Sequence, residues 1–328
     1  MTTPILSDRR VLMLRTAMGP LIADALDDPD VLEIMLNPDG RLWVDRLSSG
    51  RSPLGALAAT DGERIIRLVA AHVNSEVHRA RPLLSAELPQ SGERFEGVLP
   101  PASLAPAFAL RKRARHVIAL EQYANDGILT PAQVHLLRDA MHKRLNILVA
   151  GGTSSGKTTL ANALLAAVAE TGDRVLVLED TVELQCASQD QVSLRTQTGV
   201  VSMADLVRST LRLRPDRIVV GEVRGAEALD LIKAWGTGHP GGIATLHAGS
   251  CQGALLRLEQ LILEVALTAP RPLIAETVNL IVFLAGRGRA RRVQQIAQVI
   301  GHDDQGYRLQ PVGCPANPTL IDIHGATP

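Results

Sequence analysis

From residue 145 onwards, short apolar runs alternate with longer stretches of helical periodicity. The apolar runs cover residues 145–150, 174–178, 217–222 and 242–247, and the intervening stretches predict helices over 159–168, 203–213 and 226–235. Short, continuously apolar strands that alternate with helices are typical of a parallel sheet buried on both faces. This pattern therefore predicts an α/β domain over residues 145–328, with ligands at the carboxyl ends of its strands.

The first part of the chain has a different pattern. A helical stretch over about 9–26 is interrupted by Gly19-Pro20, which predicts a kink or break. Two strand-like runs flank the turn Asn37-Pro38-Asp39-Gly40, as in a β-hairpin, and a helical pattern follows over about 61–73. We expect a small α+β domain over residues 1–115 and a bridge over 116–144.

Towards the carboxyl terminus, an amphipathic helix is expected over about 255–267, and residues 275–284 lead into a strand. The basic stretch 287–292 follows this strand directly. Such a short basic stretch could meet acidic lipid or a partner, but a hairpin with a solvated tip is favoured.

Composition narrows the classes of function. Lys+Arg and Asp+Glu are both 34 and aromatic residues make up 2%, which argues against a nucleic-acid-binding surface or a base-stacking platform. The three cysteines are far apart, so they form neither a metal-binding pair nor a disulfide framework. No apolar run approaches the roughly 18 residues of a membrane span, and the start of the chain lacks a secretory-signal pattern. We therefore expect a cytoplasmic protein, with membrane contact at most peripheral.

The strongest chemical signal is Gly151-Gly152-Thr153-Ser154-Ser155-Gly156-Lys157-Thr158, which has the full G-x-x-x-x-G-K-S/T spacing between a predicted strand and a predicted helix. The glycines let backbone N–H groups curl around an anion, and the helix start adds partial positive charge. Lys157 would reach the β- and γ-phosphates, and the Thr158 hydroxyl would be a ligand of Mg²⁺. The residues expected to bind the nucleotide are Gly152, Thr153, Ser154, Ser155, Gly156, Lys157, Thr158 and Thr159.

Three residues at strand ends are candidates for phosphoryl transfer to water. Glu222 closes the third strand and is expected to polarise the attacking water, with helix capping as the alternative. Glu179 closes the second strand and would hold the metal through a water or share the positioning of the attacking water. His247 ends the fourth strand and would contact the γ-phosphate or Glu222, although a histidine at a strand end is often structural. Because no guanine-reading N/T-K-x-D motif is present, ATP is favoured over GTP.

Arg94 and the basic cluster at 111–115 allow two interpretations. Composition alone favours a solvated basic face. In the alternative, some of these arginines approach the terminal phosphate of a nucleotide.

Four motifs in this order resemble those of the secretion ATPases of the VirB11/PilT/GspE superfamily, in its conjugative-transfer branch. They are a Walker A loop at 151–158, an Asp box at 178–184, a Walker B motif at 217–225 and a His box that ends at His247. The segments at 30–37 and 99–101 are similar to the family's amino-terminal domain, so the likeness covers nearly the whole chain.

The resemblance implies a RecA-like P-loop ATPase domain, with helices on both faces of a parallel sheet, preceded by a smaller α+β domain. It implies a cytoplasmic homo-hexamer that uses ATP and Mg²⁺ to power type IV secretion or conjugative DNA transfer with inner-membrane components, without sequence-specific contact to nucleic acid. Arg94 and either Arg111 or Arg113 match the family's arginines near the γ-phosphate, which reverses the preference for a solvated face. Asp216 precedes its strand, so Thr158 and ordered waters would carry more of the Mg²⁺.

Three alternatives remain open from the residues. A pilus assembly or retraction ATPase would share the motor motifs. A nucleic-acid translocase would be stimulated by single-stranded DNA in a salt-sensitive way. A scaffold that binds nucleotide without hydrolysing it would form rings and release negligible phosphate. Type II secretion ATPases usually carry a four-cysteine zinc module, which this sequence lacks.

Overall fold

The structure is a computed structural model that describes residues 4–89, 91–113, 117–197, 199–314 and 319–320, with side chains from residue 11 onwards except that of Arg289. It divides into two compact units, Met1–Ala114 and Arg115–Pro328. The boundary expected between residues 115 and 116 lies outside the described residues, as does Arg115 of the basic cluster. The three-part division drawn from the sequence therefore stays a prediction.

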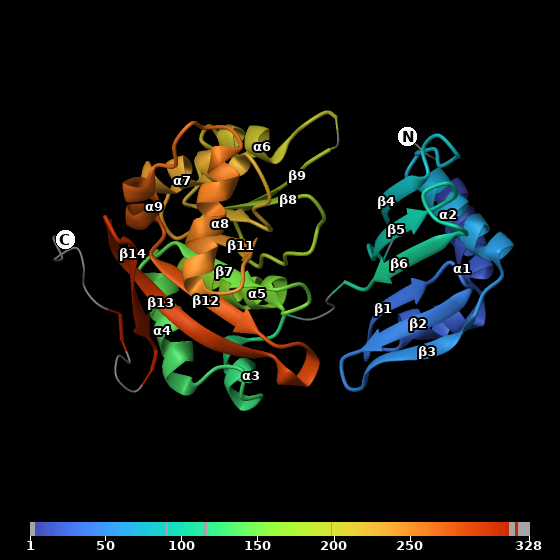
Figure 1. Ribbon diagram of the computed structural model, residues 1–328, viewed down its shortest axis with the longest axis horizontal. Coiled ribbons are helices and arrows are strands. Elements are labelled where there is room, and N and C mark those ends of the chain that lie inside the picture. The colour runs from blue at the N-terminus through green and yellow to red at the C-terminus, as the bar shows by residue number, and fades with distance from the viewer. Residues whose placement is uncertain (1–3, 90, 114–116, 198, 315–318, 321–328) are drawn as a thin grey trace. The chain divides into compact units, whose positions relative to one another are not determined.

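The first unit is a six-stranded antiparallel sheet with two helices packed on it (Figure 1). Its strand order is β3-β2-β1-β6-β5-β4. The elements are α1 (Pro4–Asp27), β1 (Val31–Leu36), β2 (Arg41–Arg46), β3 (Gly50–Ala56), α2 (Ala59–His72), β4 (Leu83–Glu87), β5 (Arg94–Val98) and β6 (Ala107–Arg111). The expected β1–β2 hairpin is present, and α1 is kinked at Gly19, whose φ is 68°. Alternate residues of the strands pack against both helices in one apolar core.

The second unit contains an eight-stranded sheet in the order β14-β13-β12-β7-β11-β10-β8-β9. Its strands are β7 (Ile147–Gly151), β8 (Val175–Glu179), β9 (Gln191–Arg195), β10 (Arg217–Val220), β11 (Ile243–His247), β12 (Leu280–Ala285), β13 (Arg292–Asp303) and β14 (Gly306–Val312). The six strands β9, β8, β10, β11, β7 and β12, in this order in the sheet, pair in parallel. At the β12 edge, β13 and β14 add an antiparallel hairpin that the alternating pattern did not predict. The predicted α/β sheet is therefore confirmed, with this mixed edge as a correction.

Helices cover both faces of this sheet (Figure 1). They are α3 (Leu120–Asn125), α4 (Pro131–His142), α5 (Lys157–Val168), α6 (Met203–Thr210), α7 (Glu227–Gly236), α8 (Cys251–Leu263) and α9 (Arg271–Thr277). One core contains residues of α3, α4 and α5, and a second contains residues of α6, α7, α8 and α9. Alternate residues of β7 enter the two cores, which is why this strand is apolar at every position. Within the described residues, no helix is both long and apolar enough to span a bilayer.

A buried ion pair joins the amino ends of two strands. The guanidinium of Arg217 is fully buried, and its Nε donates to Asp173 Oδ2 at 2.6 Å. Its other nitrogens donate to the carbonyl oxygens of Met141 (2.7 Å) and Gly241 (3.2 Å), and Arg144 also pairs with Asp173. A buried charge is tolerated when it is paired and its donors are satisfied, so this network ties α4, β8 and β10 together.

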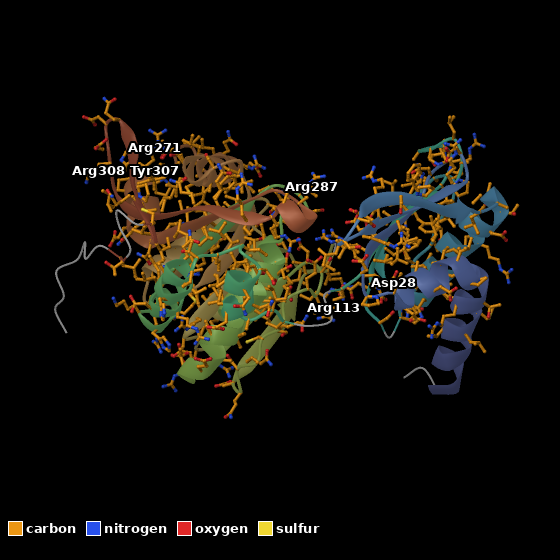
Figure 2. All side chains as sticks on the ribbon, turned by 90° about the horizontal axis from the view of Figure 1, so that it is seen from below. Asp28, Arg113, Arg271, Arg287, Tyr307 and Arg308 are labelled. Carbon is orange, nitrogen blue, oxygen red and sulfur yellow. The ribbon has the colours of Figure 1, made fainter. Side chains whose placement is uncertain are left out.

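A second buried carboxylate lies at the far edge of the sheet. Arg271 Nε lies 3.0 Å from both carboxylate oxygens of Glu259, which is buried on α8. Figure 2 shows Arg271, Tyr307 and Arg308 together at this end of the unit. Burial and the neighbouring Glu259 carboxylate raise the pKa of Tyr307. This cluster attaches the β13–β14 hairpin to the helices and takes no part in the site at the strands' carboxyl ends.

Candidate functional site

Residues 152–156 connect β7 to α5 in a tight loop, so the motif at 151–158 runs from the last residue of β7 into the first turn of α5. Ser154 and Gly156 have positive φ values of 60° and 92°, and such turns make successive backbone N–H groups converge on a concave surface. A Cβ on Gly151 would lie 2.5 Å from Ser155 Oγ and 2.8 Å from the Leu284 carbonyl oxygen, so only glycine fits there. The Ser155 hydroxyl is buried and has no hydrogen-bond partner among the described residues. The loop is therefore a preformed anion cradle with an unused donor.

The Lys157 side chain folds back over this loop. It is 7% exposed, and Nζ donates to the carbonyl oxygens of Gly151 (3.2 Å) and Gly152 (3.0 Å). The same nitrogen lies 3.4 Å from His247 Nδ1 and 3.5 Å from His247 Nε2. The parallel register that pairs His247 with Gly151 brings these two side chains together. An arriving phosphate would replace the loop carbonyls as the partner of Lys157.

Glu222 lies between two basic side chains at the end of β10. Its Oε1 is 2.9 Å from His247 Nε2, and its Oε2 accepts a 2.5 Å hydrogen bond from Arg224 Nη2. Burial of the Glu222 carboxyl raises its pKa, but the hydrogen bond from Arg224 and the charges of Arg224, His247 and Lys157 lower it, and the net pKa lies below the ordinary value. Glu222 is therefore ionised at neutral pH.

Arg224 is a member of this cluster that the sequence analysis did not single out. Besides Glu222, its guanidinium approaches Asp180 Oδ2 at 3.6 Å, so it connects the loops that follow β10 and β8. The sequence feature that could have identified Arg224 as a site residue is its position two residues after Glu222.

The contacts of Glu179 differ from those of Glu222. Glu179 is buried, and its Oε1 accepts hydrogen bonds from the backbone N–H groups of Glu183 (2.9 Å) and Leu184 (2.7 Å). Its Cγ lies beside Gly221, where a Cβ would approach to 3.0 Å. The carboxylate thus holds the loop after β8 against the end of β10. These contacts do not test the expected role of Glu179 in positioning the metal or the attacking water, which stays a prediction.

Thr158 is the second residue of α5 and is half-buried at the mouth of the loop. Its hydroxyl suits a Mg²⁺ ion, which accepts few protein ligands and retains waters and phosphate oxygens. Asp216 lies at the opposite end of the sheet, where its carboxylate accepts from the Arg174 N–H at 2.8 Å. In the described part of the chain, no group of three or more His, Cys, Asp or Glu residues forms a metal site.

The three candidate arginines belong to the first unit. Arg94 on β5 and Arg111 on β6 are directly opposite each other in the antiparallel register. Phe95 and Leu110, their neighbours, lie in the core, so the two arginines share the face of the sheet that points away from it. Arg111 Nε also lies 3.8 Å from Glu33 Oε1.

Arg113 lies past the end of β6, where the chain leaves the sheet (Figure 2). Its guanidinium is near Gly92, where a Cβ would approach Nη1 to 3.6 Å. Lys112, which lies between Arg111 and Arg113 in the chain, points in another direction, and its Nζ donates to the Asp28 carbonyl oxygen. The structure therefore brings Arg94 and Arg111 together and leaves Arg113 outside the pair.

Comparison with known proteins adds to this geometry. The sequence profile of a family described as "Type II/IV secretion system protein" matches residues 62–322. The chain is 49% identical to a "Probable conjugal transfer protein TrbB" of Sinorhizobium fredii, over 92% of this chain and 93% of that protein. It is 46% identical to a "Conjugal transfer protein TrbB" of Rhizobium radiobacter, over 92% and 94% of the two chains. The X-ray structure of the Legionella pneumophila ATPase DotB is similar with a TM-score of 0.58 and 19% identity, over 89% of this chain and 79% of that chain, and this likeness supports the fold alone.

Proposed function

The chain belongs to the type II/IV secretion system protein family, and from this membership we propose that it hydrolyses ATP with Mg²⁺ to drive conjugative DNA transfer through a type IV secretion machine. One observation carries the proposed chemistry: Lys157, His247 and Glu222 converge beside an anion-shaped loop at the carboxyl ends of three neighbouring strands. The conjugal transfer relatives favour this process over pilus retraction. They also disfavour a free nucleic-acid translocase.

The proposed roles follow from the contacts. Lys157 exchanges its loop carbonyls for the β- and γ-phosphates, and residues 152–159 hold the phosphate chain through their N–H groups. Ionised Glu222 orients the attacking water and accepts its proton. Bound Mg²⁺, held by Thr158, would neutralise charge on the phosphates. Glu179 is retained in the proposal as a support that fixes the loop beside Glu222.

His247 connects the two halves of this mechanism. It contacts both Lys157 and Glu222. Each Glu222 oxygen already has one partner, His247 or Arg224, and keeps a further lone pair that can accept a hydrogen bond from a water. Movement of Lys157 onto phosphate would release His247 from its present contact with Lys157 and so change the contact that His247 makes with Glu222. We assign His247 this sensing role.

Arg94 and Arg111 are proposed to supply positive charge to the γ-phosphate. Arg94 and Arg111 lie directly opposite each other on one face of the sheet, so a single phosphate group would meet both guanidinium groups there. Guanidinium groups suit phosphate because they can donate two parallel hydrogen bonds.

Replacing Arg111 by Ala should lower the kcat for ATP hydrolysis by about 100-fold or more, since an arginine that stabilises transition-state charge contributes at least this much. Arg113→Ala is the matched control and should change kcat by less than about threefold, because a surface charge outside the pair contributes little. Phosphate release under saturating Mg–ATP measures both, and the mass of each variant confirms equal assembly. Equal losses in the two variants would contradict the assignment of the pair.

We further propose that the active form is a homo-hexamer, cytoplasmic and at most peripheral at the inner membrane, that works with membrane components of the secretion complex. The experiment is ATPase activity per protomer against protein concentration, with mass measured on the same samples. If the ring completes the site, activity should rise steeply as the mass passes from monomer to hexamer. Constant activity from a monomer would remove the secretion-motor interpretation, and rings without phosphate release would indicate a scaffold.

A further inference from the structure

The loop between β12 and β13 lies next to the phosphate-binding loop. β12 pairs in parallel with β7, and Leu284 is opposite Gly151, so the residues that follow β12 emerge beside residues 152–156. The sequence analysis explained the basic stretch at 287–292 as a solvated hairpin tip. Arg287 agrees with this, since it is exposed and projects from the loop (Figure 2). The expectation of a solvated side chain is wrong for Arg291.

Arg291 packs against the phosphate-binding loop itself. A Cβ built on Gly156 would lie 2.8 Å from Arg291 Cζ, 2.8 Å from Nε and 2.9 Å from Nη1. Because these three distances are nearly equal, Gly156 lies over the flat face of the guanidinium rather than at its edge. The N–H groups in the guanidinium plane therefore point along the surface of the loop.

One of these donors is not satisfied. Arg291 Nε is buried and has no hydrogen-bond partner among the described residues. The hydroxyl of Tyr123, a fully buried residue of α3, also has none. Burial raises the pKa of Tyr123, and the positive charge of Arg291 lowers it. A buried donor without an acceptor costs free energy, so its presence beside an anion cradle indicates a ligand that supplies the acceptor.

The position of Arg291 identifies which part of the ligand it meets. Glu222 and His247 follow β10 and β11, on one side of β7, so the terminal phosphate belongs on that side. β12 and its loop flank β7 on the other side. In any residue the N–H bond and the Cα–Cβ bond point in different directions. Arg291 lies where a Cβ on Gly156 would be, so it lies beside the N–H groups of the anion cradle and does not form part of the cradle. A phosphate chain with its terminal phosphate at Glu222 would therefore run towards Arg291, and its nucleoside end would lie there.

We propose that Arg291 is a nucleotide-binding residue that donates a hydrogen bond from Nε to the sugar or base of ATP. This inference rests on the proposed function, because it assumes that the loop binds a nucleoside triphosphate. It adds a contact from the β12–β13 connection, which lies outside the four motifs and which neither glycine spacing nor strand position identified.

The test compares ATP with inorganic tripolyphosphate, both with Mg²⁺, by isothermal titration calorimetry. Arg291→Gln should raise the Kd for ATP about tenfold or more, as expected for loss of a hydrogen bond from a charged donor. The Kd for tripolyphosphate, which has no sugar or base, should change by less than about threefold. Arg287→Ala, in the same loop but exposed, is the control and should leave both values unchanged. Arg291→Ala provides a second variant, and thermal melting checks that each variant is folded.

Three results would overturn the inference. Equal weakening of ATP and tripolyphosphate would mean that Arg291 acts on the phosphates or braces the loop. Unchanged affinity for both ligands would mean that it makes no contact. Failure of the unmodified chain to bind ATP while it binds tripolyphosphate would instead refute the proposed function, and a contact at the nucleoside end with it.

Discussion

Replacing Glu222 by Gln should lower the kcat for ATP hydrolysis by about 10²–10⁴-fold, the range that a positioned general base contributes. The amide keeps the size of the side chain, but it cannot accept the proton of the attacking water. It also removes a negative charge close to Lys157 and the incoming phosphates. The Kd for ATP should therefore stay equal or fall slightly. Phosphate release and calorimetric ATP titration on the same preparation measure the two effects separately.

Glu227→Gln is the matched control for this variant. Glu227 is the first residue of α7, and its Oε1 accepts hydrogen bonds from the backbone N–H groups of Arg224 (2.6 Å) and Gly225 (2.9 Å). Because the Gln carbonyl oxygen can still accept both hydrogen bonds, activity should remain within a few-fold of the unmodified chain. Normal turnover in Glu222→Gln would refute the role of Glu222. A loss of the same size in Glu227→Gln would show that the first effect reflects local structure.

Replacing Asp173 by Asn should destabilise the second unit by about 3 kcal/mol, at the lower end of the range for breaking a buried ion pair. The change leaves the buried Arg217 guanidinium without a counter-charge, although its hydrogen bonds to Met141 and Gly241 remain. The chain has two tryptophans, Trp43 in the first unit and Trp235 in the second. Urea unfolding followed by fluorescence in a Trp43→Phe background therefore reports the second unit alone.

The same ion pair predicts a pH dependence. Burial raises the pKa of Asp173, but hydrogen bonds from Arg217, Thr171 and Arg144 and the Arg217 charge lower it, and the net pKa lies below its ordinary value of 3.8. The folded pKa of Asp173 is lower than its unfolded pKa. The ion pair therefore stabilises the fold fully above the unfolded pKa, and this contribution is lost as the pH falls through the folded pKa. The stability difference between the unmodified chain and Asp173→Asn should be constant above about pH 5 and shrink as the pH falls below that.

Asp139→Asn supplies the surface comparison for Asp173. Asp139 pairs with Lys143 at 2.9 Å on an exposed face of α4, and both side chains are about half exposed. An exposed pair of this kind contributes about 0.5 kcal/mol or less. If Asp173→Asn cost no more than Asp139→Asn, the buried network would not be a source of stability.

The sequence by itself determined the features that depend on neighbouring residues. The glycine spacing of residues 151–158 requires a tight loop whatever the surroundings, and continuously apolar runs require strands buried on both faces. The turn at 37–40 and the kink at Gly19 are equally local, and the structure contains both. The strand ends then placed Glu222 and His247 at the same edge of the sheet as Lys157. β9 escaped prediction because, as an edge strand, it has no continuous apolar run.

Tertiary structure decided the contacts between residues that are distant in the chain. Whether Arg111 or Arg113 lies opposite Arg94 depends on the β5–β6 register, because a shift of two residues would exchange them. The contacts of Arg224 with Asp180 and of Arg291 with Gly156 depend on which strands are neighbours in the sheet. A basic stretch has the same composition whether it is solvated or packed on a loop. Its role is fixed by strand order and packing, which bring partners together that no local pattern connects.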